Sequence, residues 1–182
     1  DVYETARRLA KGTAKDGSLP YAHLGMGENM RGQFSPEIHA PKNNSIGEWT
    51  LNVLSRIYNR RLFDEVREFY AENAVLHFIC DQDLTGHAQI QGMLIGLFAS
   101  FPNAAFVVER VTCNERIEGH AVAVRWRLNA VHEGLGYFGT PSSKPVTVLG
   151  ITHYTVIGGK ITEEWMTFDG MDVLKQIVDT EV

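Results

Sequence analysis

Hydrophobic positions recur at helical spacing in the first part of the chain and at alternating spacing in the last part. Apolar residues at helical intervals predict a first helix from Ser45 to Leu62, which begins with a capping-box pattern. A short second helix is expected after Asp64. A third is expected over residues 90–101, where Pro102 would stop it. These helices are predicted to precede most of the strands.

Alternation predicts strands over residues 75–80, 105–113, 120–132, 146–157 and 161–168, followed by a last helix that uses Met171, Leu174 and Ile177. Gly158-Gly159 is a two-residue hairpin signal between the last two strands. Helices followed by adjacent strands indicate an α+β domain with an antiparallel sheet, not a chain of βαβ units. The apolar face of strand 120–132 ends in His132, and we expect this face to point inward.

Residues 1–44 lie outside this pattern. Val2–Lys11 has the spacing of a helix end, whereas residues 12–44 are rich in Gly, Pro, Ser and Asn and are interpreted as a linker or surface arm. The compact domain is therefore expected to comprise residues 45–182. A faint likeness between the first residues and the segment from Asp169 leads to the hypothesis that residues 1–44 include the tail of a preceding module.

Composition limits the partners that the protein is expected to have. Seventeen basic and 22 acidic residues give a formal charge of −5, and no basic stripe is present, so we expect no nucleic-acid partner. No apolar run is long enough to span a membrane. Cys80 and Cys113 do not form a disulfide framework and are interpreted as reduced side chains, which favours a cytoplasmic location.

Several motifs can be set aside on their spacing. Gly134, Gly136 and Gly139 match G-x-G-x-x-G, but the segment that follows contains two prolines and cannot open the helix that a dinucleotide site needs. We interpret the segment as a loop in which Tyr137 and Phe138 are lid side chains. The seven histidines show no metal-binding spacing, and no nucleophile elbow is present, so neither a metal site nor acyl transfer is expected.

Acid–base chemistry in an apolar cavity remains. Alternation places Glu163, Trp165, Thr167 and Asp169 on one face of the last strand, and His153 lies on the neighbouring strand across the hairpin. Each residue also has an ordinary interpretation. Asp169 can cap the last helix, and His153 and His132 can be hydrogen-bonded core histidines. The spacing alone leaves both interpretations open.

A family resemblance bears on this choice. The chain resembles the SnoaL-like polyketide cyclases, in the ester-cyclase branch of the nuclear-transport-factor-2-like superfamily. The resemblance covers residues 46–178 and rests on the stretches 140–151 and 159–165, on Asp169 with residues 174–177, and on Trp126, His132-x-Gly134, Gly86 and Phe101-Pro102-Asn103. It implies a cone-shaped, curved antiparallel sheet closed by N-terminal helices, an internal apolar pocket and a homodimer.

The resemblance also implies a reaction. Asp169 matches the aspartate that acts as general base and acid when a small apolar polyketide ester closes a ring, without metal or cofactor. His153 is the nearest match to a pocket histidine of the cyclases, and His77, Trp126, His132 and Trp165 are expected to line the pocket. The alternatives are a ketosteroid-isomerase-like proton shuttle and a non-catalytic ligand-binding or dimerisation module. A buried Asp169 would favour an enzyme, and a surface helix cap would favour the binding module.

Overall fold

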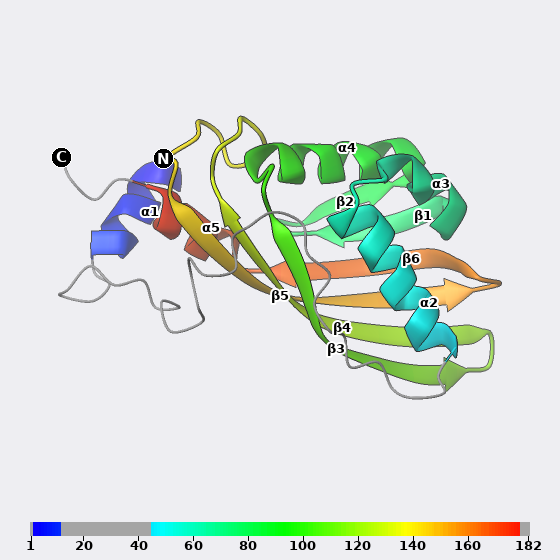
Figure 1. Cartoon of the computed structure of the whole chain (residues 1–182). Helices are drawn as coiled ribbons and strands as arrows, with labels where there is room; N and C mark the ends of the chain where they lie inside the picture. The colour runs from blue at the N-terminus through cyan, green and yellow to red at the C-terminus, as the bar shows by residue number, and fades with distance from the viewer. Residues whose placement is uncertain (1, 12–44, 179–182) are drawn as a thin grey trace.

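The computed structural model of the chain describes residues 2–11 and 45–178, so the predicted arm over residues 12–44 lies outside the described residues. The helices are α1 (Val2–Lys11), α2 (Ser45–Leu54), α3 (Val66–Phe69), α4 (Gly86–Ser100) and α5 (Gly170–Ile177) (Figure 1). A π-helical turn, Ser55–Asn59, continues α2, and a 3-10 turn, Phe63–Glu65, precedes α3. The predicted first helix is therefore confirmed, with a change of pitch in its second half.

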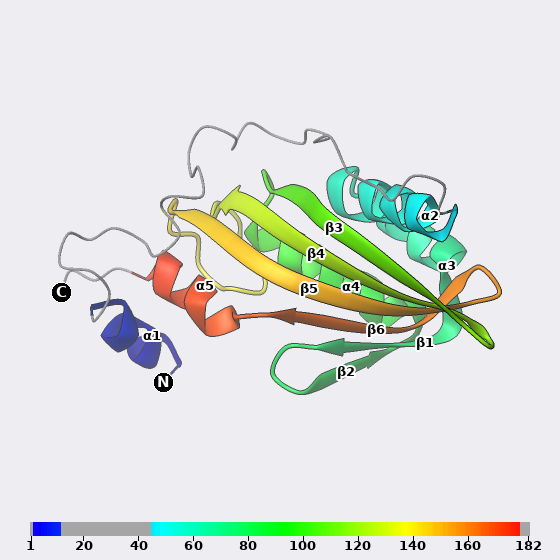
Figure 2. The ribbon, with the colours of Figure 1, turned by 90° about the horizontal axis from the view of Figure 1, so that it is seen from below.

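One curved sheet carries the domain. Its strands are β1 (Tyr70–Phe78), β2 (Gln82–Thr85), β3 (Ala105–Arg116), β4 (Gly119–Val131), β5 (Pro145–Ile157) and β6 (Lys160–Phe168). They lie in the order β2-β1-β6-β5-β4-β3 (Figure 2). The sheet is open, with β2 and β3 at its edges. All neighbours are antiparallel except β1 and β6, which run parallel.

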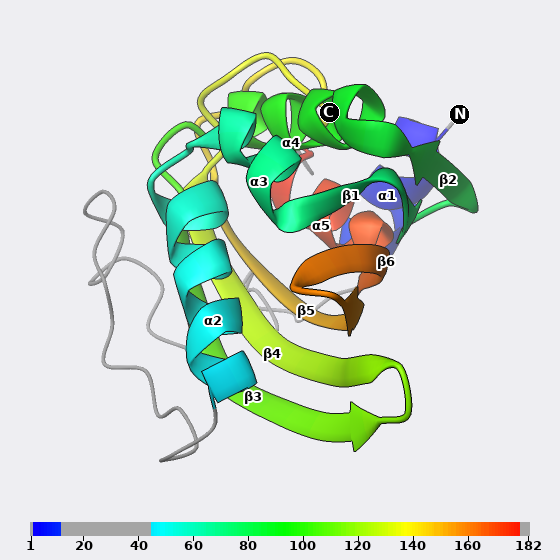
Figure 3. The same cartoon turned by 90° about the vertical axis from the view of Figure 1, so that its right-hand side faces the viewer.

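Helices α2, α3 and α4 lie on one side of this sheet, which we call the inner face (Figure 3). The inner face of β4 carries Val122, Val124, Trp126, Leu128 and Ala130, all buried as the alternation predicts. The Trp126 indole lies over Gly150 on β5. A Cβ atom at Gly150 would come within 2.1 Å of the indole Cζ2 atom. The absence of a side chain at Gly150 therefore makes room for the largest side chain of the core.

The predicted α+β class and curved sheet are confirmed, with three differences. β1 begins at Tyr70, so α3 is shorter and the first strand longer than expected. The four-residue strand β2 was not predicted, because its polar residues give no alternation. The parallel pairing of β1 with β6 corrects the expectation of a purely antiparallel sheet. This pairing joins segments far apart in the chain, which local patterns do not specify.

Helix α1 packs against α5 at one end of the domain. Ala6 is fully buried and packs with Val178, while Met171 and Leu174 complete the contact. The Tyr3 hydroxyl donates a 3.1 Å hydrogen bond to the carbonyl oxygen of Phe138. The predicted helix at the start of the chain is thus confirmed, and it joins the last helix to the loop that follows β4.

Candidate functional site

The inner face of β6 places a carboxyl group inside the core. Glu164 is fully buried. The Tyr70 hydroxyl donates to its Oε2 atom at 2.6 Å, and the Tyr58 hydroxyl donates to its Oε1 atom at 3.4 Å. The Tyr154 hydroxyl interacts with the same carboxyl group. Three hydroxyls from a helical turn and two strands therefore converge on one buried acid.

Burial governs the protonation of this cluster. It raises the pKa of Glu164 to about 7, although hydrogen bonds from Tyr70, Tyr58 and Tyr154 act in the opposite direction. The pKa values of the three tyrosines lie well above their ordinary value, mainly because burial disfavours the phenolate. The cluster can therefore hold a proton on Glu164 near neutral pH, while the tyrosines act as hydrogen-bond donors.

Asp169 lies at the surface, at the junction of β6 and α5. It is the N-cap of α5, and its Oδ1 atom accepts a 3.0 Å hydrogen bond from the Asp172 amide. The residue is exposed. Asp169 therefore caps helix α5, as its position in the sequence allowed. Its carboxylate is exposed and not buried, as a base in an internal pocket would be.

Asp169 nevertheless borders an apolar hollow of about 500 Å³ at this end of the domain, which we call the end hollow. The predicted lid residues Tyr137 and Phe138 line it, as does Phe168. Val2 and Tyr3 of α1 complete one part of its wall. The structure thus brings Asp169 together with two of the predicted binding residues. The volume lies within the range of small-molecule sites.

His153 and Trp165 lie on the opposite side of the sheet, which we call the outer face. The two residues are cross-strand partners on β5 and β6, and Trp165 is 40% exposed. The His77 ring stacks on the Trp165 indole with a centroid separation of 4.9 Å. These positions correct the expectation that the three residues line an internal pocket, because Glu164 and not Trp165 occupies the inner face of β6.

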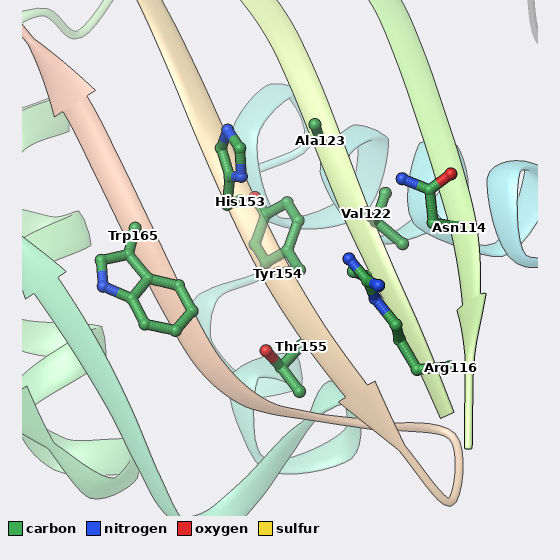
Figure 4. A pocket seen from close by; sticks show the side chains of 9 residues that line it. Asn114, Arg116, Val122, Ala123, His153, Tyr154, Thr155 and Trp165 are labelled. Atoms are coloured by element: carbon green, nitrogen blue, oxygen red, sulfur yellow. The ribbon is translucent and has the colours of Figure 1, made fainter. Parts of the chain in front are cut away.

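Two hollows border these outer-face residues. The larger, of about 570 Å³, lies between β3 and β6 and is called the outer-face groove; Asn114, Arg116, His153, Thr155 and Trp165 line it (Figure 4). The second, of about 510 Å³, is lined by both Asp169 and His153. Asp169 follows β6, and His153 pairs with Trp165, so roughly 13 Å of strand separates the two side chains. They border one hollow but are too far apart to share a proton.

Trp126 and His132 are the predicted binding residues that lie in the core. The Trp126 Nε1 atom donates a 2.9 Å hydrogen bond to the Thr152 hydroxyl. His132 is fully buried beside Phe101, and its Nδ1 atom lies 3.2 Å from the Ser142 hydroxyl. Burial lowers the pKa of His132. The hydrogen-bonded core histidine considered for this position is therefore the arrangement found.

Sequence reasoning missed Glu164. The signal that could have found it is the same alternation that grouped Trp165 with Asp169, because it places Glu164 on the other face of the strand. The large apolar side chain of Trp165 led to the prediction that its face of β6 points inward, whereas the structure places that face outward. In the structure Met166 and Phe168 are buried with Glu164, so the apolar partners of the inner face were also present in the sequence.

Two findings concern metals and membranes. Among residues 2–11 and 45–178, no three His, Cys, Asp or Glu side chains are arranged to hold a metal ion. Within the same ranges, no helix is long and apolar enough to cross a membrane.

Comparison with protein families gives one match. The family model of the SnoaL-like polyketide cyclases matches residues 49–177, which include every strand and helices α3 to α5. A search of curated proteins found no match to the chain.

Solved structures share the fold. A proposed SnoaL-like polyketide cyclase from Jannaschia sp. CCS1 superposes with a TM-score of 0.66 and 26% identity, covering 78% of this chain and 97% of that protein. The proposed polyketide cyclase IdmH from Streptomyces antibioticus superposes with a TM-score of 0.60 and 20% sequence identity. The superposition covers 73% of this chain and 98% of IdmH. AclR, a proposed hydroxylase from Streptomyces galilaeus, superposes with a TM-score of 0.57 and 20% sequence identity. The superposition covers 69% of this chain and 77% of AclR. One scaffold thus accompanies two proposed types of reaction.

Proposed function

Because the chain belongs to the SnoaL-like polyketide cyclase family, we propose that it is a cofactor-independent acid–base enzyme. Its substrate would be a small apolar carbonyl compound bound in the end hollow, with Asp169 as the general base. The observation that carries this proposal is the position of the Asp169 carboxylate at the edge of an apolar hollow that Tyr137, Phe138 and Phe168 also line.

The contacts of Asp169 leave room for this role. The helix cap engages Oδ1, and no other described residue donates a hydrogen bond to Oδ2. A carboxylate oxygen at the edge of an apolar hollow can remove a proton from the carbon beside a bound carbonyl group. The resulting enolate carbon attacks a second carbonyl carbon of the same molecule and closes a ring. The protonated carboxyl group then returns its proton to the alkoxide.

One substitution separates the base from the cap. Asp169→Asn keeps a good capping side chain and removes the base, so helix α5 stays formed while proton transfer is lost. We expect turnover of small β-keto esters that carry a further ketone group, which the enolate carbon can attack, to fall by roughly 10²- to 10⁴-fold, with substrate binding retained. Asp172→Asn is the matched control, since that carboxylate belongs to the same helix and does not line the end hollow. Undiminished turnover in Asp169→Asn would exclude Asp169 as the base.

A second candidate is a non-catalytic ligand-binding module. The exposed, capping Asp169 favours it, because such a carboxylate has a complete structural role without chemistry. A panel of β-keto esters and steroids distinguishes the candidates. Saturable binding without turnover in the native protein supports the binding module. Isomerisation of a steroid instead of ring closure would assign a proton-shuttle reaction to the same hollow.

A further inference from the structure

The outer-face groove exists because two small side chains lie between rows of larger ones. Ala121 of β4 pairs with Asn114 on one side and with Thr155 on the other. Ala123 pairs in the same way with His153 of β5. Methyl groups therefore form the floor, and longer side chains form the walls. The resulting volume of about 570 Å³ suits a small molecule.

One wall of the groove supplies hydrogen-bond donors. Arg116 and Asn114 extend from β3, and Figure 4 shows the Arg116 side chain running across β4 toward β5. Neither side chain has a hydrogen bond or ion pair with another described residue, and no aspartate or glutamate lines the groove. A guanidinium group with this freedom can bind a carboxylate through two parallel hydrogen bonds.

The opposite wall supplies a flat aromatic surface. Trp165 is held in place by His77, whose ring lies against the indole at an interplanar angle of 21°. His77 is itself fixed, since its Nδ1 atom lies 2.7 Å from Asp83 and its Nε2 atom lies 3.2 Å from Glu163. An indole fixed in this way presents a ready stacking surface to a ring in the groove.

The two walls are separated by three strand spacings, from β3 to β6, which amounts to roughly 14 Å between backbones. We propose that the outer-face groove binds a flat aromatic compound bearing a carboxylate, with the carboxylate on Arg116 and the ring against Trp165. His153 on β5 lies between these ends, and Asn114 lies beside Arg116 on β3; both side chains can donate further hydrogen bonds. The site is distinct from the end hollow, and the proposal does not depend on the proposed function.

Calorimetric titration with 2-naphthoate and with the neutral 2-naphthamide tests the proposal. We expect saturable binding of 2-naphthoate and weaker binding of the amide. Arg116→Gln should weaken naphthoate binding by roughly 10- to 100-fold, to the level of the amide, because a charge-assisted hydrogen-bonded pair is lost. Arg110→Gln is the matched control, since Arg110 lies on the same strand, is exposed and does not line the groove.

A second variant tests the groove by its shape. Ala123→Leu fills the floor and should abolish binding of both compounds, while thermal unfolding reports whether the domain remains folded. The proposal is overturned if 2-naphthoate shows no saturable binding at millimolar concentration. It is also overturned if Ala123→Leu binds normally or if the two arginine variants behave alike. If Ala123→Leu and Trp165→Leu instead convert a two-chain species to a single chain in sedimentation, without affecting naphthoate, this face is an interface between copies.

Discussion

The Tyr70 hydroxyl donates a 2.6 Å hydrogen bond to Glu164 Oε2 across the parallel pair β1 and β6, in the interior of the domain. This contact links the start of the first strand to the middle of the last one. It also places an ionisable group where solvent cannot stabilise its charge. The stability of the domain should therefore depend on the protonation of a single buried side chain.

We expect Glu164→Gln to become more stable relative to the native protein as pH rises. Burial raises the pKa of Glu164 in the folded state from 4.5 to about 7. The folded state thus holds a proton that the unfolded state releases, and the native protein loses stability as pH rises between these values. The loss is on the order of 3 kcal/mol, and glutamine does not incur it. Urea unfolding at about pH 5 and pH 8 measures the difference. Parallel pH profiles for the two proteins would contradict the prediction.

Tyr70→Phe should destabilise the domain, and more at high pH than at low pH. The variant removes the closest donor to Glu164, which raises the pKa of the carboxyl group further, because this hydrogen bond acts to lower it. We expect a loss of roughly 1.5–3 kcal/mol once Glu164 is ionised, the range for hydrogen bonds to charged groups. Tyr58→Phe is the control, since the Tyr58 hydroxyl lies farther away, at 3.4 Å. Equal effects of the two variants would argue against the assigned geometry.

Asp169→Ala should cost about 1 kcal/mol of unfolding free energy, whereas Asp169→Asn should cost little. Alanine removes the acceptor of the Asp172 amide, and asparagine keeps one. Chemical denaturation of both variants measures the cap separately from any catalytic effect. A large loss of stability in Asp169→Asn would mean that the negative charge, and not the capping oxygen, stabilises this end of α5.

Gly150→Ala should destabilise the core by roughly 3 kcal/mol or more, because the added methyl group would overlap the Trp126 indole. The control is Gly92→Ala in helix α4, where an added Cβ meets no atom within 4 Å. That variant should be neutral or more stable by about 0.5–1 kcal/mol, since alanine favours a helix. Thermal unfolding compares the two directly. Equal melting temperatures would contradict the close approach of Trp126.

Local patterns predicted the elements and the inner face of β4, since Val124, Trp126 and Leu128 alternate clearly along one strand. They did not predict which face of β6 points inward. Glu164 is stabilised there by tyrosines 94 and 106 residues away in sequence, and a strand pattern carries no information about such partners. The candidate site could be predicted only in part. Alternation correctly grouped Trp165 with Asp169 on one face of the strand, but the side of the sheet on which that face lies depends on tertiary packing.

Helix α1 gives the end hollow two wall residues, Val2 and Tyr3, that precede the region shared with the family, which begins at residue 49. The end hollow therefore combines residues of the region that matches the family, Asp169 among them, with two residues that lie outside it. A search for substrate preference confined to the family region would overlook these two residues. Exchanging Tyr3 for smaller or larger side chains therefore tests whether this wall selects among the molecules that the proposed site binds, with loss of the Tyr3 hydrogen bond to Phe138 as part of the change.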